Sequence, residues 1–529
     1  MRTRGPALAM ASVLLIGVAA NGCRSGESLA NAGIDRPPAT TTATTTPSTG
    51  GNGATGGTGV SGGSGGSGVT TAPTTTTPPP TTQPRKLDTL PKCDVSALDA
   101  ASASGPVEIT FWHGLSNENG AELQRQTDLY NSSQNKVHVN LQFQGGYEDV
   151  INKYLQSNTQ NRPDLVQMPE YMLQQMIDTK SIVPTQACAE AAHYDMSPFL
   201  PQALDAYATE SVQWAMPFNM SVPVLFYRRD LFEKAGLDPN KPPQSFDELL
   251  HQGQQLVSSG ASSYSIALDS DFDGGGGWYI EQWLAKAGEF YADNENGRAA
   301  PATKVLYNDA AGLALMTYLQ TLINQGGAVY VGDNPSGQDA LLKLADATTP
   351  AAMTISTSAS LGIVLSVLGG GLIPGITQDD VGVGYMPGPN GGLGALVGGN
   401  SLYIVDGKGA EKAAAAWDYI TFLETAQQQS EFAAATGYIP VRQDALELDP
   451  IKSVYTSDPR FRVGYDQLIG SADAPTSNGP VLGPLQQVRR VTAQAVAAVL
   501  TGTDPQAALD AGAQQADDLI ANYALQNPG

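Results

Sequence analysis

Segments with the periodicity of β-strands alternate with segments with the periodicity of α-helices, and few folds accommodate that order. Val107 to Trp112 is apolar at every second position, Ala121 to Asn131 has a helical pattern, and Val137 to Phe143 alternates as a strand. A helix is predicted from near Tyr147, and a third strand is predicted at Leu165 to Met168. Strands and helices in this order favour an open parallel sheet, whose ligands lie beyond the carboxyl ends of its strands.

The alternation restarts after Asn219, which predicts a second α/β lobe. A strand is expected at Val222 to Tyr227, a helix at Arg229 to Ala235 and a further strand at Tyr264 to Leu268. A chain of 529 residues is long enough for two lobes with separate cores. We expect one lobe to comprise residues 92–218 and 397–437 and the other to comprise residues 219–396 and 438–529, with chain crossings between them.

The N-terminus has the layout of an export signal, which we assign to residues 1–22. Arg2 and Arg4 precede an apolar run that ends at Ala20, and the run is too short to span a bilayer. Cys23 follows small residues, which resembles the bacterial lipobox in which the cysteine is lipidated, although Ala20 and Asn21 depart from its usual residues. We therefore expect an exported protein, anchored by a lipid on Cys23 at the extracytoplasmic face of the cell membrane. Cleavage nearby, leaving a free secreted protein, is the alternative.

Residues 23–91 form the expected tether between this anchor and the folded region. Beyond Arg24 they are mainly Thr, Pro, Gly and Ser, a composition that buries too little apolar surface to offset its conformational entropy. Gly59 to Gly63 fits the G-x-S-x-G nucleophile pattern, but that motif needs a strand before it and a helix after it. Only low-complexity sequence surrounds it, so we predict a disordered linker and no nucleophile.

Two cysteines remain after Cys23, and such a pair in an exported protein predicts one structural disulfide. The partners would be Cys93 and Cys188. The bond would join the start of the folded region to a later loop and limit the conformations of the unfolded state. Two buried free thiols are the alternative.

Net charge and motif content exclude several classes of function. The net charge is −23 and only 15% of residues are charged, so no basic face is expected to neutralise nucleic-acid phosphates. None of the four histidines has metal-ligand spacing and no P-loop is present, so we predict no cofactor, metal site or catalytic residue. Asp269 to Gly274 fits the first half of a D-x-D-x-D-G calcium loop, but its twelfth position is Ile280 rather than Glu. A secreted hydrolase remains a distant alternative.

Aromatic and glycine-rich segments give weaker indications of a cleft. His113 follows a predicted strand and either packs in the core or contacts a ligand. Trp278 is the tryptophan that we favour for a cleft, where such a ring stacks on polyols, and Gly274 to Gly277 form either a cleft loop or a turn. Leu361 to Ile373 is apolar but too short to cross a membrane, and we expect a buried helix with a glycine-rich exit.

Six short segments occur in the order that is typical of one family of binding proteins. They are Phe111-Trp112-His113, Gly146-Tyr147-Glu148, Pro217 to Tyr227, Lys234 to Pro239, Gly398 to Leu402 and Thr436 to Val441. Together they resemble the extracellular solute-binding proteins of carbohydrate-class ABC importers, most closely the glycerol-3-phosphate-binding members, from Val107 to Ala521. The resemblance implies an α/β, two-lobed periplasmic-binding-protein-like fold of type II, similar to maltose-binding protein, with the ligand cleft between the lobes.

Carried over position by position, the resemblance also implies a ligand-binding site. Its residues are Tyr147, Glu170, Ser221, Thr357 or Ser358, Gly399, Tyr438 and Arg489, with Trp278 as a wall of the cleft. Arg489 would supply a charged fork for a phosphate, assisted by hydroxyl groups and the Gly399 amide. Glu170 and Tyr147 would bind glycerol hydroxyl groups. A solvated Arg489 on a helix surface is the alternative.

The sequence departs from the family pattern at two places in this site. The family's serine falls on Thr357, and one of its two cleft tryptophans falls among the glycines before Trp278, which implies a pocket that is open at one end. We expect a monomeric receptor, not an enzyme, that binds glycerol-3-phosphate or a glycerophosphodiester such as glycerophosphocholine and delivers it to the transmembrane subunits of an ABC permease. A disaccharide or oligosaccharide is the alternative ligand, for which aromatic stacking would matter and Arg489 would not.

Overall fold

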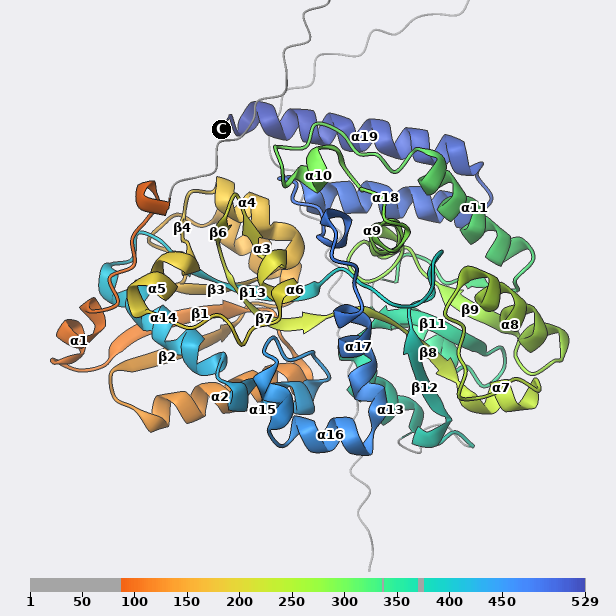
Figure 1. Ribbon diagram of the computed structural model, residues 1–529, viewed down its shortest axis with the longest axis horizontal. Helices are drawn as coiled ribbons and strands as arrows, with labels where there is room; N and C mark the ends of the chain where they lie inside the picture. The colour runs from red at the N-terminus through yellow and green to blue at the C-terminus, as the bar shows by residue number, and fades with distance from the viewer. Residues whose placement is uncertain (1–86, 335–336, 370–374, 529) are drawn as a thin grey trace, which may run out of the picture. The chain divides into compact units, whose positions relative to one another are not determined.

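The computed structural model describes residues 87–334, 337–369 and 375–528. The chain divides into two units, Met1–Thr76 and Thr77–Gly529, and every described residue belongs to the second. The expected signal segment, Cys23, most of the expected linker and the G-x-S-x-G match lie outside the described residues. Figure 1 shows the second unit, in which two β-sheets are each surrounded by helices.

The first sheet has the strand order β2-β1-β3-β13-β4, and β7 also pairs with β13. Its strands are β1 (Val107–His113), β2 (Val137–Phe143), β3 (Leu165–Pro169), β4 (Ile182–Val183), β7 (Met216–Ser221) and β13 (Gly398–Val405). The strands β1, β2 and β3 are parallel, as predicted, but β13 runs antiparallel to β3, β4 and β7. The chain enters β13 from the second sheet rather than from a helix packed on the first, so the crossover argument does not govern its direction.

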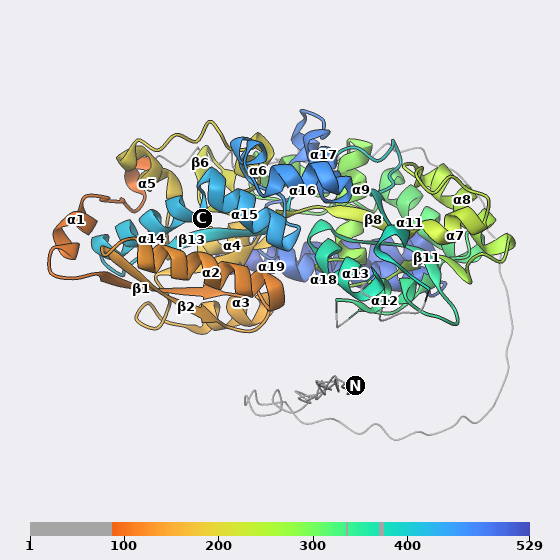
Figure 2. The ribbon, with the colours of Figure 1, turned by 90° about the horizontal axis from the view of Figure 1, so that it is seen from below.

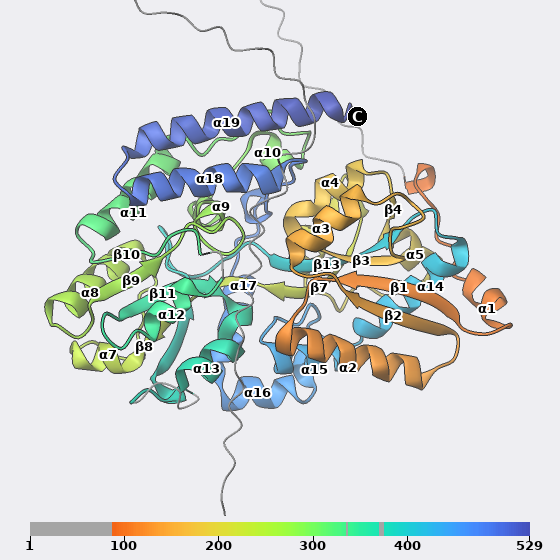
Figure 3. The same ribbon diagram turned by 180° about the vertical axis from the view of Figure 1, so that it is seen from behind.

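Helices cover both faces of this first sheet, as a parallel arrangement requires. Ile109 and Phe111 of β1 share one core with Leu123 of α2 (Asn117–Ser133) and with α14 (Ala410–Leu423). Trp112, the next residue along β1, packs in another core with Tyr154 of α3 (Tyr147–Gln156). Figure 3 shows α2 and α3 at this sheet.

The second sheet has the order β10-β9-β11-β8-β12. Its strands are β8 (Pro223–Arg228), β9 (Tyr264–Leu268), β10 (Val329–Tyr330), β11 (Ala351–Thr357) and β12 (Val381–Tyr385). The strands β9, β10 and β11 are parallel, whereas β8 is antiparallel to both β11 and β12. The predicted strand at Tyr264 to Leu268 is confirmed at both ends.

Four helices pack together beside the second sheet. They are α9 (Gly276–Ala287), α11 (Ala310–Asn324), α18 (Leu485–Leu500) and α19 (Pro505–Gln526). The helices α18 and α19 lie side by side in Figures 1 and 3. Helix α16 (Ile451–Ser457) packs against α15 (Ala426–Thr436). Helix α17 (Val463–Ile469) packs against the strands β8 and β12 of the second sheet.

The remaining elements are short. The helices are α1 (Ala97–Ser102), α4 (Leu173–Asp178), α5 (Thr185–Ala192), α6 (Pro201–Ala206), α7 (Arg229–Lys234), α8 (Phe246–Ser258), α10 (Asp293–Gly297), α12 (Asp339–Leu344) and α13 (Leu361–Gly369), and β5 (Ala208–Thr209) pairs with β6 (Val212–Gln213). In α13, Val364 and Leu368 are buried while Gly362 and Ser366 are exposed. The expected buried helix is therefore amphipathic, with one face on the core. Among the described residues, no helix combines the length and the apolar character needed to cross a membrane.

The chain crosses from the first sheet to the second at Val222, the single residue between β7 and β8. Ser358, beyond the end of β11, fixes this crossing: its amide donates to the Val222 carbonyl oxygen (2.8 Å) and its Oγ accepts from the Val222 amide (3.3 Å). The return crossing leads into β13, where Gly399 pairs with Met220 of β7. Figure 2 shows the first sheet and the second sheet on either side of these crossings.

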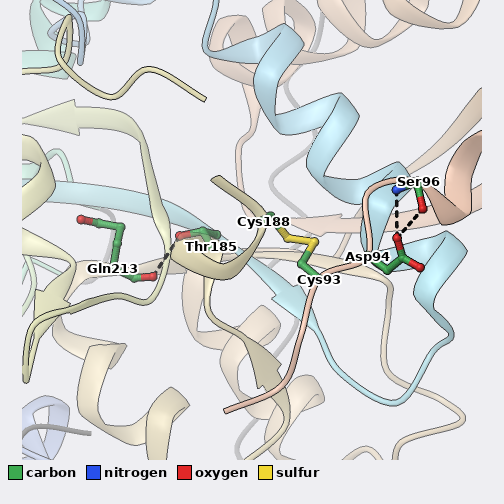
Figure 4. Close-up of a disulfide and its surroundings, with 6 residues drawn as sticks. All are labelled: Cys93, Asp94, Ser96, Thr185, Cys188 and Gln213. Atoms are coloured by element: carbon green, nitrogen blue, oxygen red, sulfur yellow. Dashed lines mark hydrogen bonds between the residues drawn. A yellow bond between two sulfur atoms is a disulfide. The ribbon is translucent and has the colours of Figure 1, made fainter. Parts of the chain in front are cut away.

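The structure contains the expected disulfide between Cys93 and Cys188. Cys188 lies in α5 and is fully buried, and Cys93 precedes α1 (Figure 4). The segment around each cysteine is held by further bonds: the Asp94 carboxylate accepts from the Ser96 amide, and Thr185 Oγ1 donates to the Gln213 carbonyl oxygen. The bond therefore connects two locally ordered segments that are 95 residues apart in sequence.

Candidate ligand-binding site

A cavity of about 200 Å³ lies where the strand ends of both sheets meet. The first sheet contributes residues at the end of β3, at the end of β7 and at the start of β13. The second sheet contributes Thr357 at the end of β11 and the loop that follows β9. Loops beyond strand ends carry such sites because their side chains need not serve the sheet itself. We call this cavity the inner pocket.

The inner pocket brings together seven of the nine residues that the resemblance implies. They are Tyr147, Glu170, Ser221, Trp278, Thr357, Gly399 and Tyr438. The other two lie behind its wall. Ser358 is committed to the Val222 crossing, and Arg489 is buried against carboxylates outside the inner pocket.

Backbone geometry explains the two glycines at the start of β13. Gly399 has φ +95°, and a Cβ there would meet the Asn219 carbonyl oxygen at 2.0 Å. A Cβ on Gly398 would meet Cζ2 of Trp278 at 2.5 Å. Any larger residue would push β13 away from β7 or displace the indole ring, so both glycines shape the pocket wall.

Two tyrosines from separate elements meet in the inner pocket. Tyr147, the first residue of α3, and Tyr438, just beyond α15, have their hydroxyl oxygens 3.1 Å apart. Burial is the main cause that raises the pKa of both phenols, and each remains a neutral group that both donates and accepts. Such a pair suits the hydroxyl groups of a ligand.

Arg489 of α18 forms a buried ionic cluster with Glu170 and Glu281. Its Nη1 lies 2.8 Å from Glu170 Oε1, its Nε lies 2.5 Å from Glu281 Oε1, and its Nη2 lies 2.8 Å from Glu281 Oε2. The exposed fractions of the three side chains are 2%, 13% and 1% for Arg489, Glu170 and Glu281. Burial opposes the charge on Arg489, but the two carboxylates outweigh burial and raise its pKa. The guanidinium fork is thus paired with two carboxylates, and its contact with a ligand phosphate stays a prediction.

Three more carboxylates line the inner pocket on the loop after β9: Asp269, Asp271 and Asp273. Burial raises the pKa of Asp269 to about 7 and is also the first cause that raises the pKa of Asp273 to about 7. Among the described residues that line this pocket there is no lysine, arginine or histidine. The sequence of this loop resembles only the first half of a calcium loop, and no group of metal-binding side chains occurs in the described part of the chain.

A larger outer chamber of about 980 Å³ continues from the inner pocket and shares Tyr147, Asp271 and Asp273 with it. Arg490 lines this chamber, with its guanidinium 3.8 Å from the centre of the Phe272 ring. Arg490 also pairs with Glu148 of α3. The Glu148–Arg490 pair is half exposed and lies at the outer chamber, which we call the rim of the cleft. The Arg489 pairs with Glu170 and Glu281 are buried behind the inner pocket.

His113 lies outside both cavities and packs between Phe111 and Phe143, with ring centroids 5.9 and 5.7 Å away. Burial lowers its pKa to about 4, so the imidazole is neutral at physiological pH. Of the two roles considered for this histidine, the structure gives it packing in the core.

Comparison with known proteins places the chain in a family. The family model described as bacterial extracellular solute-binding protein matches residues 127–462, well over half of the chain. The chain belongs to this family.

Relatives of this solute-binding protein include the sn-glycerol-3-phosphate-binding periplasmic protein UgpB of Yersinia pseudotuberculosis. The two are 28% identical over 440 residues, which cover 81% of this chain and 95% of the relative. UgpB of Escherichia coli O1:K1 is 26% identical over 434 residues, with 80% and 94% coverage. The sequence resemblance is therefore confirmed over most of the chain.

Solved structures show the same fold. The cyclic α-maltosyl-1,6-maltose binding protein of Arthrobacter globiformis has a TM-score of 0.64 at 20% identity and covers 79% of this chain and 100% of its own. UgpB of Mycobacterium tuberculosis, in complex with glycerophosphocholine, has a TM-score of 0.63 at 19% identity with the same coverage. The expected two-lobed fold, similar to maltose-binding protein, is confirmed for this solute-binding protein.

Sequence reasoning missed two features of this solute-binding protein: the acidic loop that lines the inner pocket, and Glu281, which pairs with Arg489 behind the pocket wall. The loop was detectable, because Asp269 directly follows the predicted strand at Tyr264 to Leu268, and ligands lie beyond the carboxyl ends of strands. Glu281 had no comparable signal. It lies 208 residues from its partner Arg489, and only the packing of α9 against α18 brings the two together.

Proposed function

We propose that this protein is the extracytoplasmic receptor of an ABC importer for glycerol-3-phosphate or a glycerophosphodiester. The observation that carries the proposal is the inner pocket, in which Tyr147, Glu170, Ser221, Thr357 and Tyr438 converge from both lobes. The similarity to glycerol-3-phosphate-binding proteins over 440 residues supports the ligand class. The protein acts by binding its ligand, without chemical change.

The pocket groups match the ligand's glycerol end. Hydroxyl groups of Ser221, Thr357, Tyr147 and Tyr438 both donate and accept, and the Glu170 carboxylate accepts from glycerol hydroxyls. Burial raises the pKa of the Glu170 carboxyl, and Arg489 opposes that rise. In this proposal Arg489 is a positioning residue that acts through Glu170.

Ligand bound between the lobes would favour their closed arrangement in proportion to its differential affinity for it. The Glu170–Arg489 and Glu148–Arg490 pairs support this mechanism, because each joins an element of the first lobe to α18 of the second. The closed form would then dock on the transmembrane subunits of the permease. We propose a monomer with lobes at residues 92–218 with 397–437 and 219–396 with 438–529. Residues 1–22 would direct export, and a lipid on Cys23 would hold the protein at the extracytoplasmic face of the membrane.

A neutral disaccharide or oligosaccharide is the second candidate ligand, and one observation favours it. The described lining of the inner pocket contains Trp278 and two tyrosines but no cationic side chain. Aromatic rings stack on sugars, and carboxylates accept bonds from sugar hydroxyl groups. This candidate keeps the receptor role and changes only the cargo.

Thermal unfolding of the full chain with glycerol-3-phosphate, glycerophosphocholine, maltose and trehalose tests the ligand class. A ligand that binds only the folded state stabilises it by ~2.7 kcal/mol at a concentration of about 100 times Kd, which raises the midpoint by a few degrees. We expect a shift with a glycerol phosphate and none with the disaccharides. If only a disaccharide raised the unfolding midpoint, the proposal that the ligand is a glycerol phosphate would be wrong.

A pair of tyrosine variants tests the site itself. Tyr438→Phe removes only the hydroxyl that faces Tyr147, and we expect it to weaken binding about 10-fold without unfolding the protein. Tyr403→Phe is the matched control, because Tyr403 is a buried tyrosine of β13 outside the inner pocket. If the two variants bound the ligand with equal affinity, the Tyr438 hydroxyl would not contribute to ligand binding.

A further inference from the structure

Three amide groups form a line behind the inner pocket, and their direction is fixed by the first of them. The backbone amide of Gly114, just beyond β1, donates to Gln167 Oε1 on β3 (3.0 Å). Gln167 Nε2 donates in turn to Asn219 Oδ1 on β7 (2.7 Å). A backbone N–H only donates, so Gln167 must present its oxygen to Gly114 and its nitrogen to Asn219. We call these three residues the amide relay.

The direction of the relay determines which end of the Asn219 amide is left over. Because Oδ1 accepts from Gln167, the remaining end is Nδ2, which only donates. Asn219 and Gln167 are both fully buried. No hydrogen bond links Asn219 Nδ2 to any described residue. A buried donor without a partner costs free energy, and most such groups in proteins have one, so Asn219 Nδ2 calls for an acceptor.

The structure indicates the phenol oxygen of Tyr438 as that acceptor. Burial raises the pKa of this phenol, and interactions with the side chains of Tyr147 and Asn219 oppose the rise. An amide donor that faces a phenol oxygen has this effect, because it favours the ionised form. The next residue, Ile439, donates its amide to the Met220 carbonyl oxygen (2.7 Å), which holds this segment against β7. Hydrogen bonds in ligand-free sites are often long and tighten when a ligand binds.

We propose that Asn219, oriented by Gln167, is a positioning residue that sets the hydrogen-bond polarity of Tyr438. With ligand in the inner pocket, Asn219 Nδ2 donates to the Tyr438 oxygen. Tyr438 is then occupied as an acceptor and offers its own O–H. This inference rests on the proposed function, in which Tyr438 binds the ligand, and goes beyond it. Neither Asn219 nor Gln167 lines the inner pocket or the outer chamber, so both act through Tyr438.

This polarity selects the kind of ligand atom that the tyrosine pair binds. The hydroxyl oxygens of Tyr147 and Tyr438 are 3.1 Å apart, so one of their two hydrogens serves the bond between them. The other hydrogen is directed at the ligand, and an oxygen that accepts it completes the chain of bonds. A hydroxyl, an ether or a phosphate oxygen meets this requirement. A ligand group that only donates does not.

A double-mutant cycle in ligand affinity tests the proposal. Asn219→Leu keeps the approximate size of the side chain and removes the donor, and Tyr438→Phe removes the hydroxyl that it serves. In calorimetric titration of the full chain with glycerophosphocholine and with glycerol-3-phosphate, we expect each single variant to lose about 10-fold in affinity. The double variant is expected to lose little more than either, because the donor has no role once its acceptor is gone. Losses that multiply in the double variant, or no loss in Asn219→Leu, would overturn the proposal.

The variant Gln126→Leu is a matched control for the loss of a buried amide. Gln126 of α2 is fully buried, donates to the Gln428 carbonyl oxygen (2.9 Å) and lines neither cavity. We expect it to lower the midpoint of urea unfolding, as Asn219→Leu does, and to leave the affinity within about 2-fold of the parent protein. An equal loss of affinity in Gln126→Leu would show that Asn219 has only a structural role.

A second variant leaves Asn219 in place and serves if Asn219→Leu does not fold. Gln167→Met removes the group that orients the Asn219 amide, so that Nδ2 no longer has a fixed direction. We expect an affinity loss of about 3- to 10-fold, and none when the same change is made in Tyr438→Phe. The same loss in both backgrounds would overturn the amide relay.

The parent protein separates this proposal from the proposed function. If it bound maltose or trehalose but neither glycerol phosphate, the proposed function would be wrong, and the same cycle with that sugar would decide whether Asn219 serves Tyr438. If it bound a glycerol phosphate and the losses in the cycle multiplied, the proposed function would stand and the amide relay alone would be wrong.

Discussion

Two groups of carboxylates lie in or beside the inner pocket, and they differ in whether they form an ion pair within the protein. Glu170 and Glu281 share Arg489, which forms three bonds with them at 2.5 to 2.8 Å. Asp269, Asp271 and Asp273, on the opposite lobe from Glu170, have no cationic side chain in the described lining of their pocket. The first group is complete without a ligand, so it positions the lobes and Glu170. The second group forms no ion pair among the described residues.

The largest effect is expected at the neutralised group. Arg489→Met leaves Glu170 and Glu281 buried without a cation, and breaking such a pair costs about 3–5 kcal/mol of the free energy of unfolding. Urea unfolding of the ligand-free protein measures the change. The double variant Arg489→Met with Glu281→Gln is expected to recover part of the loss, because it removes one uncompensated charge. A loss below ~1 kcal/mol in the single variant would show that this cluster is not the tight structural unit described above.

The group without a cation is expected to respond in the opposite direction. Asp273→Asn removes a charge that burial disfavours, so we expect the free energy of unfolding at pH 8 to rise by about 1–3 kcal/mol. As a control, Asp379→Asn makes the same change at an exposed residue outside both cavities, and it is expected to remain within about 0.5 kcal/mol of the parent protein. Destabilisation by Asp273→Asn would mean that the carboxylate has a cationic partner already, and the contrast between the groups would fail.

The pH dependence sharpens the same contrast. The folded-state pKa of Asp269 and Asp273 is about 7, above the ordinary value of 3.8, so the folded protein binds more protons than the unfolded chain between these values. Their contribution to stability is therefore highest below about pH 4 and falls as the pH rises to about 7. The gain from Asp273→Asn is expected to shrink between pH 8 and pH 5, as measured by urea unfolding at both. A gain that does not depend on pH would contradict this assignment.

Neighbouring charged and polar groups also influence the pKa values of Asp269 and Asp273. Around Asp273 they are Asp271, Glu170, Glu281 and Arg489, with the phenols of Tyr147, Tyr171 and Tyr438 beside it, and around Asp269 they are Asp271, Asp339 and Asn334.

The smallest effect is expected at the rim. Arg490 and Glu148 are 44% and 48% exposed, and exposed ion pairs contribute less than about 1 kcal/mol. Arg490→Ala is therefore expected to change the free energy of unfolding by under 1 kcal/mol, and by less still in 0.5 M salt. If Arg490→Ala lowered the free energy of unfolding as much as Arg489→Met, the stabilisation by ion pairs between the lobes would not depend on their burial.

Local pattern determined which parts of the fold could be predicted. The strands at Val137 to Phe143 and at Tyr264 to Leu268 have the predicted bounds, because alternation over five to seven residues is itself the signal of a strand. The antiparallel direction of β13 had no such signal. It depends on a pairing with β3 more than 200 residues away, which periodicity does not encode.

The site divides in the same way. The resemblance to a known family identified seven residues that line the inner pocket. Four of them belong to the short segments that carry the resemblance: Tyr147, Ser221, Gly399 and Tyr438. The resemblance gave no indication that Arg489 pairs with Glu281, because Glu281 belongs to no motif. Which charge neutralises which depends on the packing of α9 against α18, so only the structure reveals the pairing.

The disulfide has a mechanical consequence for whatever is attached to the N-terminal segment. A force applied there first meets Cys93, which is covalently joined to Cys188 in α5. The load then enters the body of the first lobe through a covalent bond. The hydrogen bonds between β1 and β2, which begin at Val107, are not peeled apart one by one. A protein held by its N-terminal end would therefore keep its binding cleft undistorted while the surroundings pull on that end.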